Sequence, residues 1–250
     1  MKKLIGITVL FLLIQANVFS QTMNVTYKLI TEKDISEGYS FSAEYPKVDF
    51  GPDALMGLRG IAGDINLSID TLVKGKIFNF KNIVSVMPNK TAMNGMLSSK
   101  DITIYPLAVN GTIFSPQIKE FTSVMGMAHP NTSVVSLNYS AVSGGLLESI
   151  SVLFLTGSGY LKYVSDYCIN DLRTKAKSQG YTNIDNMITE GASPDLKNFG
   201  VWNISEDNLI ITFNPYTVAP YVFGIQTVSI PLANMTEMIN RYGPLEFMFR

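Results

Sequence analysis

The single histidine of the chain, His129, is the residue whose type most directly suggests catalysis or metal binding. It lies in the segment GMAHPNTSVVSLNY, between Ala128 and Pro130 and just ahead of a predicted strand. A neutral imidazole can serve as a general base or as a metal ligand. A zinc site needs three or four ligands, and Cys168 follows about forty residues later on the apolar face of a predicted helix. The spacing of these residues therefore does not predict a metal site.

The remaining candidates for catalysis have simpler explanations. No G-x-S-x-G motif marks a nucleophile. The neighbouring carboxylates of Glu206 and Asp207 fit a solvated turn better than a glycosidase pair, whose carboxylates lie a defined distance apart. The single tryptophan, Trp202, lies in an alternating strand and is expected in the core. We expect His129 and Pro130 to have a structural role at a strand start, with no catalytic residue, metal or cofactor. A cell-wall-modifying hydrolase that uses His129 and a carboxylate is the alternative.

The segment NPYTVAPYVFG, residues 214–224, has the composition of a binding loop. Its two prolines remove backbone donors, so we expect an irregular or edge segment, and its aromatic side chains offer large amphipathic faces. Exposed tyrosines on a stiffened loop are frequent in protein interfaces. The alternative is that the tyrosines fold back onto the sheet and the prolines only protect an edge from aggregation. The candidate partner-binding residues are Tyr216, Pro220, Tyr221 and Phe223.

The first twenty residues have the pattern of a secretory signal peptide. Two lysines precede an apolar run from Leu4 to Ile14, and small residues precede the expected cleavage site ahead of Gln21. The apolar run is too short for a comfortable membrane span, and no later stretch reaches the roughly 18 apolar residues that a transmembrane helix needs. We therefore expect an exported protein without a membrane span after cleavage.

Charge and sequence motifs further indicate the kind of partner and the cellular compartment of the protein. Cleavage would leave 17 basic against 20 acidic residues, which does not favour nucleic acid as a partner. The one cysteine cannot form an internal disulfide. Eight N-x-S/T sequons would be heavily glycosylated in a eukaryotic secretory route. They include Asn66, Asn110, Asn131 and Asn203. These features favour the periplasm or cell surface of a bacterium.

Hydrophobic periodicity predicts two main helices. From Pro52 to Phe80 apolar residues recur at three- and four-residue spacing, which is typical of an amphipathic helix, with Asp53 as its N-cap. This stripe consists of Leu58, Ile61, Ile65, Ile69 and Leu72. A second helix is predicted over residues 159–180, ending at Gly180. Its apolar face consists of Leu161, Val164, Cys168 and Leu172, so the thiol is expected to be a small buried hydrophobe.

Alternating and β-branched segments predict strands in three blocks. The first block covers VTYKLIT and GYSFSAEYPKV, and the second covers DITIYPLAV, TIFSPQIKEFTSVM and SVVSLNYSAV. Asn110-Gly111 and Gly144-Gly145 mark reversals within the second block. The third block covers FGVWNIS, NLIITFN and IQTVSIPL, and a short helix is predicted around MTEMINRYG. Because strands and helices are grouped and do not alternate strictly, we predict an α+β fold with a largely antiparallel sheet packed by two main helices.

Two sets of segments resemble known envelope domains. AEYPKVDFG, followed by GDINLSIDTLVKGKIFNF, resembles an accessory module found beside the catalytic domain of the peptidoglycan deacetylase PdaC. MGMAHPNTSVVSLNYSAVSGGLL, the helix over 159–180 and FGVWNISEDNLIITFNPYTVAPYVFGIQTVSIPL resemble the partner domain of that module. The pair is similar to the extracytoplasmic part of the anti-sigma factor RsiV, and the resemblance covers about residues 25–235.

The resemblance implies a two-part module with a binding or sensing role. The parts expected are a signal peptide over 1–20, a PdaC-like subdomain over 21–90 and an RsiV-like domain over 91–250. The partner it implies is a lysozyme-like protein or peptidoglycan. From the residues given, we expect neither a catalytic deacetylase domain nor a segment for binding a sigma factor. We therefore expect a secreted, non-catalytic binding module.

Overall fold

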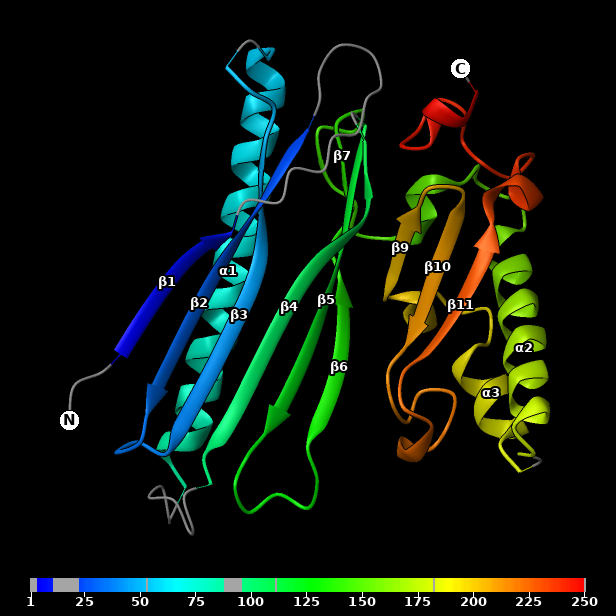
Figure 1. The fold of residues 1–250 in the computed structure, drawn as a ribbon. Coiled ribbons are helices and arrows are strands. Elements are labelled where there is room, and N and C mark those ends of the chain that lie inside the picture. Colours follow the sequence, from blue (N-terminus) through cyan, green and yellow to red (C-terminus); the bar gives the residue numbers. More distant parts are fainter. Residues whose placement is uncertain are drawn as a thin grey trace. The chain divides into compact units, whose positions relative to one another are not determined.

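The computed structural model describes residues 4–10, 23–52, 54–87, 96–110, 112–181 and 183–249, with backbone alone for the first of these ranges (Figure 1). The expected cleavage site, the N-cap at Asp53, Gly111 and the boundary near residue 90 lie outside these residues. The chain divides into two compact units. Unit 1 comprises residues 1–105 and 118–132, and unit 2 comprises residues 106–117 and 133–250.

Unit 1 is built on long strands. They are β1 (Leu4–Leu10), β2 (Asn24–Asp34), β3 (Tyr39–Asp49) and the greater part of β4 (Ser98–Val109) and β5 (Ile113–Ser123). β1 pairs antiparallel with β2, and β2 pairs antiparallel with β3 through a short turn. β3 and β4 are parallel, because α1 connects them across the sheet. Among these described strands antiparallel pairing is prominent, as the sequence predicts, and β3 with β4 forms a parallel pair.

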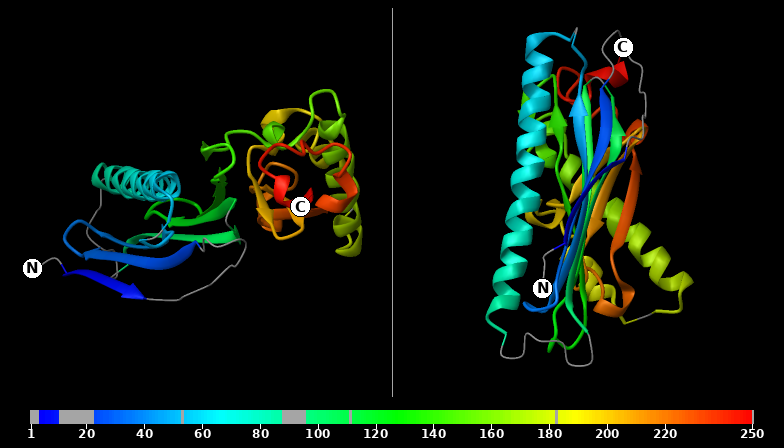
Figure 2. Two further views of the ribbon diagram at one scale, coloured as in Figure 1. Left: turned by 90° about the horizontal axis from the view of Figure 1, so that it is seen from above. Right: turned by 60° about the vertical axis from the view of Figure 1, so that its left-hand side comes forward.

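Helix α1 (Met56–Ser85) covers one face of these strands (Figure 2). The predicted stripe is confirmed in its middle, where Ile65 and Ile69 are buried. Further along, Val73 is buried and Leu72 is only half-buried, because a spacing of 3.6 residues per turn shifts the contact line along a long helix. The helix continues beyond the predicted end at Phe80 and adds the buried Val84 to the core of unit 1.

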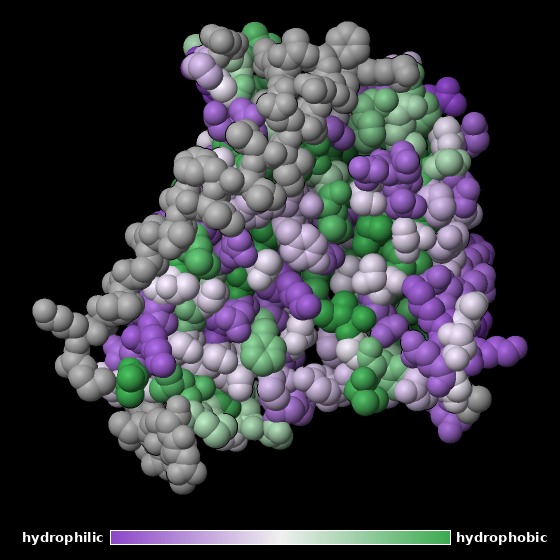
Figure 3. Space-filling model, viewed as in Figure 1, coloured by the Kyte–Doolittle hydropathy of each residue, from purple (hydrophilic) through white to green (hydrophobic). Residues whose placement is uncertain are grey.

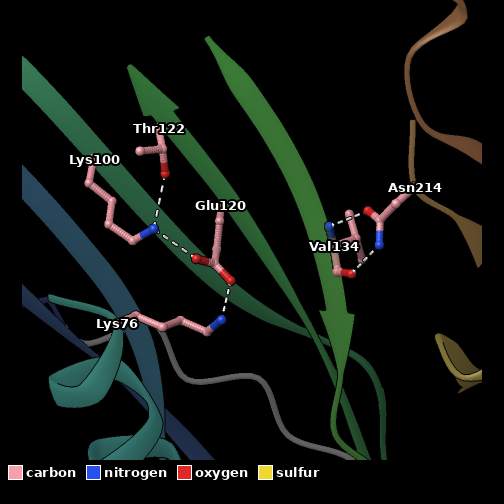
Figure 4. Close-up of polar contacts among 6 residues, drawn as sticks. All are labelled: Lys76, Lys100, Glu120, Thr122, Val134 and Asn214. Atoms are coloured by element: carbon pink, nitrogen blue, oxygen red, sulfur yellow. Dashed lines mark hydrogen bonds and ion pairs between the residues drawn. The ribbon is translucent and has the colours of Figure 1, made fainter. Parts of the chain in front are cut away.

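Ion pairs connect α1 to strands β4 and β5. Glu120 on β5 is buried and accepts hydrogen bonds from Lys76 of α1 and from Lys100 of β4, the latter at 2.8 Å (Figure 4). Lys100 also donates to the hydroxyl of Thr122 at 3.0 Å. A buried carboxylate between two ammonium groups is compensated, whereas either charge alone would be destabilising.

Asn66 makes a different kind of contact between α1 and β3. Its Oδ1 accepts from the backbone N–H of Val48 at 2.9 Å, and its Nδ2 donates to the carbonyl oxygen of Val48 at 2.8 Å. The side-chain amide thus replaces a neighbouring strand at the point where β3 has passed its last pairing with β4.

Unit 2 contains a three-stranded antiparallel sheet. Its strands are β9 (Trp202–Ser205), β10 (Asn208–Phe213) and β11 (Gln226–Pro231), in the order β11-β10-β9. Three further strands, β6 (Asn131–Ser136), β7 (Tyr139–Ser140) and β8 (Gly145–Leu146), follow β5 in the chain. The predicted reversals are confirmed: β4 and β5 are joined through Asn110, and Gly144 has a φ of 73° between β7 and β8.

Helices α2 (Tyr160–Ser178) and α3 (Asp185–Gly191) complete unit 2. The apolar face of α2 packs into the core with Val164, Cys168 and Leu172, all buried as predicted. Gly180, with a φ of 80°, follows the end of the helix. The opposite face of α2 is hydrophilic, which the purple region at the right of Figure 3 shows. It exposes Lys162, Asp166, Asn170 and Lys177.

The predicted short helix around MTEMINRYG is wrong. The chain instead forms a 3₁₀ turn at Leu232–Met235 followed by further turns, and Ile239 makes a bridge with Phe154. That contact is distant in sequence: the carbonyl of Met238 accepts from the N–H of Leu155 at 2.8 Å, and Asn240 donates its N–H to the carbonyl of Leu153 at 2.9 Å, so these backbone groups do not continue a helix. The short helix α3 and 3₁₀ turns at Ile150–Leu153 and Leu196–Phe199 were not predicted.

A buried polar network connects the segments of unit 2. The Asn203 side chain is fully buried and donates to the carbonyl of Pro116 at 2.9 Å and to the Ser115 hydroxyl at 3.1 Å. Asn138 accepts from Ser115 at 2.5 Å and donates to the carbonyl of Trp202 at 2.8 Å. Polar groups with satisfied partners fix the register between strands. Asn203 is therefore a structural residue that no glycan reaches in the folded chain.

The predicted α+β class is confirmed. The structure has a large, predominantly antiparallel sheet, a second small sheet and α-helices. Within the residues described, no helix combines the length and the apolar character needed to cross a membrane.

Candidate functional site

The loop between β10 and β11 is the site that the sequence singles out, and its backbone is tightly organised. Tyr216 donates its backbone N–H to the carbonyl of Ala219 at 3.0 Å, and Tyr221–Phe223 form a 3₁₀ turn. Tyr216 has a φ of 69°, the one non-glycine residue in the described part of the chain with a positive φ. A side chain in this region is unfavourable and persists only where its surroundings determine the conformation.

The start of this loop is held by Asn214. Its Oδ1 accepts from the backbone N–H of Val134 at 2.7 Å, and its Nδ2 donates to the carbonyl of Val134 at 2.9 Å (Figure 4). One side chain thus satisfies both polar groups of a residue on β6. Because Asn214 directly follows β10, the contact fixes the direction in which the loop leaves the sheet.

Two aromatic pairs organise the surface of the loop. The Tyr216 and Tyr221 rings lie with centroids 5.8 Å apart, and the Phe223 and Tyr181 rings meet edge-on at 4.1 Å. Tyr216 is 61% exposed, and Val222 between the pairs is 82% exposed. Other large side chains of this chain, such as Leu55 and Val86, are as exposed, so exposure of a single residue does not mark a site; the loop is singled out by two aromatic pairs next to the exposed Val222.

A shallow hollow lies beside these rings. It has a volume of about 230 Å³, including the part open to solvent, and α2, α3 and the loop form its walls. The lining residues are Leu172, Ala176, Gln179, Ile184, Ile188, Val218, Ala219, Phe223 and Gln226. Most are apolar, and two glutamine side chains provide polar groups. The space enclosed by these side chains is only about 10 Å³, roughly enough for one water molecule, so the hollow is a shallow depression of the surface and not a pocket for a side chain or a small ligand.

The wall formed by α3 is closely packed and fixed. Gly191 approaches the loop so closely that an added Cβ would lie 2.0 Å from the carbonyl oxygen of Thr217. Arg173 of α2 holds Asp185 of α3 through two hydrogen bonds, of 2.6 and 2.9 Å. The guanidinium donates to the Asp185 carboxylate and lowers the pKa of that carboxyl.

The four predicted partner-binding residues lie on this one loop. Tyr216 is exposed, whereas Pro220, Tyr221 and Phe223 are half-buried. Sequence reasoning missed Tyr181, whose contact with Phe223 spans 42 positions of the chain and leaves no local pattern. It also passed over Val222, although that residue lies within the segment that was singled out.

The predicted structural residues lie elsewhere. His129 is exposed on the turn between β5 and β6, and its Nδ1 lies 2.9 Å from the carbonyl oxygen of Pro130. Glu206 and Asp207 are exposed in the turn between β9 and β10, as predicted, and Trp202 is buried. Across the described ranges, no cluster of three or more histidine, cysteine or acidic side chains could hold a metal ion.

Cys168 is an unreactive core residue. It is fully buried, and burial together with the nearby Asp171 raises the pKa of its thiol to about 12, although Lys175 opposes this shift. Since the thiolate is the nucleophilic form, this side chain does not supply catalysis at neutral pH.

Comparison with known proteins finds a family model that matches part of unit 2. Residues 151–233 match the family model described as a protein of unknown function, DUF3298. A crystal structure of a DUF3298 family protein from Pseudomonas aeruginosa PAO1 has a TM-score of 0.55 at 11% identity, over 96% of this chain and 94% of that one. A member of the same family from Bacteroides fragilis has a TM-score of 0.53 at 13% identity, over 94% of each chain. None of the curated proteins compared matches this sequence.

These comparisons support the fold and not an activity. At such low identity the similarity shows a shared architecture, and fold alone does not determine function. The matched residues include α2, α3, all three strands of the small sheet and the aromatic loop. The candidate site therefore lies within the part of the chain that matches the family.

Proposed function

We propose that this chain is an exported, non-catalytic binding module of the bacterial envelope, and that it recognises a lysozyme-like protein through the loop of residues 214–224. The observation that carries the proposal is the exposed Tyr216 ring, held at a positive φ beside Tyr221 and Val222. Aromatic residues of this kind are the typical anchors of protein interfaces.

The backbone of Tyr216 is the first argument. A left-handed conformation costs roughly 1–2 kcal/mol for a residue with a Cβ, and glycine would avoid this cost. The loop nevertheless carries a tyrosine that is 61% exposed. Its ring therefore contributes little to the core, and presentation to a partner explains the residue better than folding does.

The chemistry of the surrounding surface is the second argument. Val222 is almost fully exposed, and the shallow hollow beside Phe223 is lined by both apolar side chains and two glutamines. An apolar centre with a few polar groups suits the side chains of another protein. A sugar would favour a flat ring next to several hydrogen-bonding groups, so peptidoglycan is the second outcome of the test.

The proposed location in the bacterial envelope rests on sequence features and on similarity to bacterial proteins. Residues 1–20 have the signal-peptide pattern, which favours the periplasm or cell surface. The two similar crystal structures come from bacterial proteins. The resemblance to the extracytoplasmic part of RsiV adds lysozyme as the partner to test first.

Calorimetric titration with a lysozyme, and separately with soluble peptidoglycan fragments, tests the proposal. We expect heat with lysozyme and a loss of more than about 1.4 kcal/mol, a tenfold change in Kd, in the Tyr216→Ala/Tyr221→Ala variant. Tyr216→Gly is a sharper single variant, because it accepts the positive φ and removes only the ring. It should bind weakly while remaining at least as stable as the parent.

The matched control is Tyr242→Ala. Tyr242 is 91% exposed in unit 2 but belongs to the C-terminal turns, so its removal should leave binding unchanged. Heat with peptidoglycan fragments alone would replace the protein partner with a glycan. Absence of heat with both ligands, or equal losses in the loop variants and the control, would reject the proposed site.

A further inference from the structure

The outer edge of β2 is a place where another strand can pair. Tyr27 lies opposite Pro46 of β3, and proline has no N–H, so this pair does not exchange two hydrogen bonds. Hydrogen-bonded and non-hydrogen-bonded pairs alternate in an antiparallel ladder. The backbone groups of Tyr27, Leu29, Thr31 and Lys33 therefore point away from β3, toward the outer edge.

This edge is occupied in the structure by β1. Leu4–Leu10 pairs with Tyr27–Lys33, with Ile7 opposite Ile30 at the centre (Figure 1). All of β1 lies within the predicted signal peptide. Cleavage ahead of Gln21 would remove β1 and leave β2, eleven residues long, with an unpaired edge. Long exposed edges attract further strands unless a protein protects them.

The sequence of β2 complements itself about Ile30. If two copies pair antiparallel with Ile30 opposite Ile30, Lys28 of each copy lies opposite Glu32 of the other. Leu29 then lies opposite Thr31, and both point their backbone groups toward the partner strand. Opposite charges placed directly across a ladder stabilise it, whereas like charges would oppose it. Within each copy Glu32 also accepts from Lys81 at 2.9 Å and Lys28 lies 4.0 Å from Asp70, so the pairs between copies would extend ion pairs that already exist.

We propose that the exported chain forms a two-fold dimer by antiparallel pairing of β2 with β2 of a second copy, centred on Ile30. The inference rests on the export part of the proposed function and not on the aromatic loop. A pairing of this symmetry closes on itself and does not propagate into a filament. In the uncleaved chain β1 covers the same seven residues of β2, so dimerisation follows cleavage.

Sedimentation velocity combined with introduced cysteines tests this dimer. The N-terminus of the exported chain is first determined by sequencing. In the proposed register the two Ile30 residues form a non-hydrogen-bonded pair with Cα atoms about 4.5 Å apart, within the range of a disulfide. Ile30→Cys should therefore give a covalent dimer under mild oxidation. Thr31→Cys is the matched control, because its two copies would lie offset at about 8 Å.

The native thiol does not interfere, since Cys168 is buried. A concentration-dependent dimer that is captured by Ile30→Cys and not by Thr31→Cys supports the proposal. A strict monomer overturns it, as does a chain that retains Met1 after export. A dimer captured only by Thr31→Cys, or by neither cysteine, overturns this register and interface. None of these outcomes depends on the lysozyme titration, so the two proposals can fail separately.

Discussion

Asn214 holds Val134 by both polar atoms of its side-chain amide, accepting from the N–H at 2.7 Å and donating to the carbonyl at 2.9 Å. Asn66 holds Val48 in the same way in unit 1. In each case one amide side chain replaces the backbone of a missing strand. Such contacts are local in space and far apart in sequence, and each leaves two backbone groups unsatisfied when it is removed.

Replacing Asn214 by alanine should therefore destabilise unit 2 by about 1–3 kcal/mol, the usual range for unsatisfied buried hydrogen-bonding groups. It should also weaken binding at the loop, because the direction of the chain after β10 is no longer fixed. Urea unfolding and the lysozyme titration measure the two effects. Asn170→Ala, at an exposed position inside α2, is the control: it should leave binding unchanged and, because alanine favours a helix more than asparagine does, should not lower stability. If the Asn214→Ala variant is as stable as the parent, the two hydrogen bonds between Asn214 and Val134 are dispensable for folding.

Gly191 tests how closely α3 and the loop are packed. In Gly191→Ala the new methyl group would lie 2.0 Å from the carbonyl oxygen of Thr217, so α3 or the loop must move. We expect a loss of about 1–3 kcal/mol in the free energy of unfolding, as for an overpacked core.

Gly75→Ala provides the contrast to Gly191→Ala. Gly75 lies in the middle of α1 with no atom within 4 Å of an added Cβ, so alanine there should stabilise the helix by about 0.5–1 kcal/mol. Thermal unfolding of both variants is the measurement. Opposite signs are expected, and a Gly191 variant as stable as the parent would contradict the close contact.

The charges around Glu120 should be strongly coupled. Glu120→Gln leaves the buried Lys100 ammonium without its carboxylate and should cost about 3 kcal/mol. The double variant Lys100→Met/Glu120→Met removes both buried charges, and Lys76, whose side chain is less buried, can turn its ammonium toward water. It should therefore be more stable than Glu120→Gln. Unfolding free energies of the double variant and of the two single variants Lys100→Met and Glu120→Met check the coupling, and a loss in the double variant equal to the sum of the single losses would argue against it.

The same carboxylate predicts a pH dependence of stability. Burial alone would raise the pKa of Glu120, but hydrogen bonds from Lys100 and Lys76 and their positive charges outweigh it and hold the pKa below its ordinary value of 4.5. A group with a depressed folded pKa contributes stability that is complete above its unfolded pKa. That contribution is lost as the pH falls from about 4.5 through the folded value. Unfolding between pH 7 and pH 3 should show a steeper decline in the parent than in Glu120→Gln; parallel curves would reject the assignment.

Several features of the fold could be predicted from sequence because they are local. The periodicity around Ile65 and Ile69 indicates the helix that became α1, and the alternation in VTYKLIT and NLIITFN indicates β2 and β10. The aromatic loop was predicted from its prolines and tyrosines. In each case the signal lies within a window of a few turns or a few strand residues.

Other features depend on contacts that no local window contains. Residues 106–117 belong to unit 2 because Ser115 contacts Asn203, 88 positions later. The chain around Ile239 is held by hydrogen bonds to the segment around Phe154, so a helix-like pattern there was misleading. The positive φ of Tyr216 depends on the whole loop, because tyrosine itself carries no preference for that conformation.

Cys168 provides the last prediction, and it also decides whether introduced cysteines can be interpreted. Its thiol is fully buried among Val164 and Leu172, and its pKa is raised to about 12, chiefly by burial. A thiol that is neither accessible nor ionised reacts slowly with disulfide reagents. The native protein at pH 8 should therefore react with Ellman's reagent only after unfolding in guanidinium, when one thiol per chain is released. The rate in the native state should follow the opening of unit 2, so variants that weaken its packing, such as Gly191→Ala, should react faster than the parent. Rapid reaction of the folded parent would place Cys168 at the surface and would contradict the packing of α2 described above.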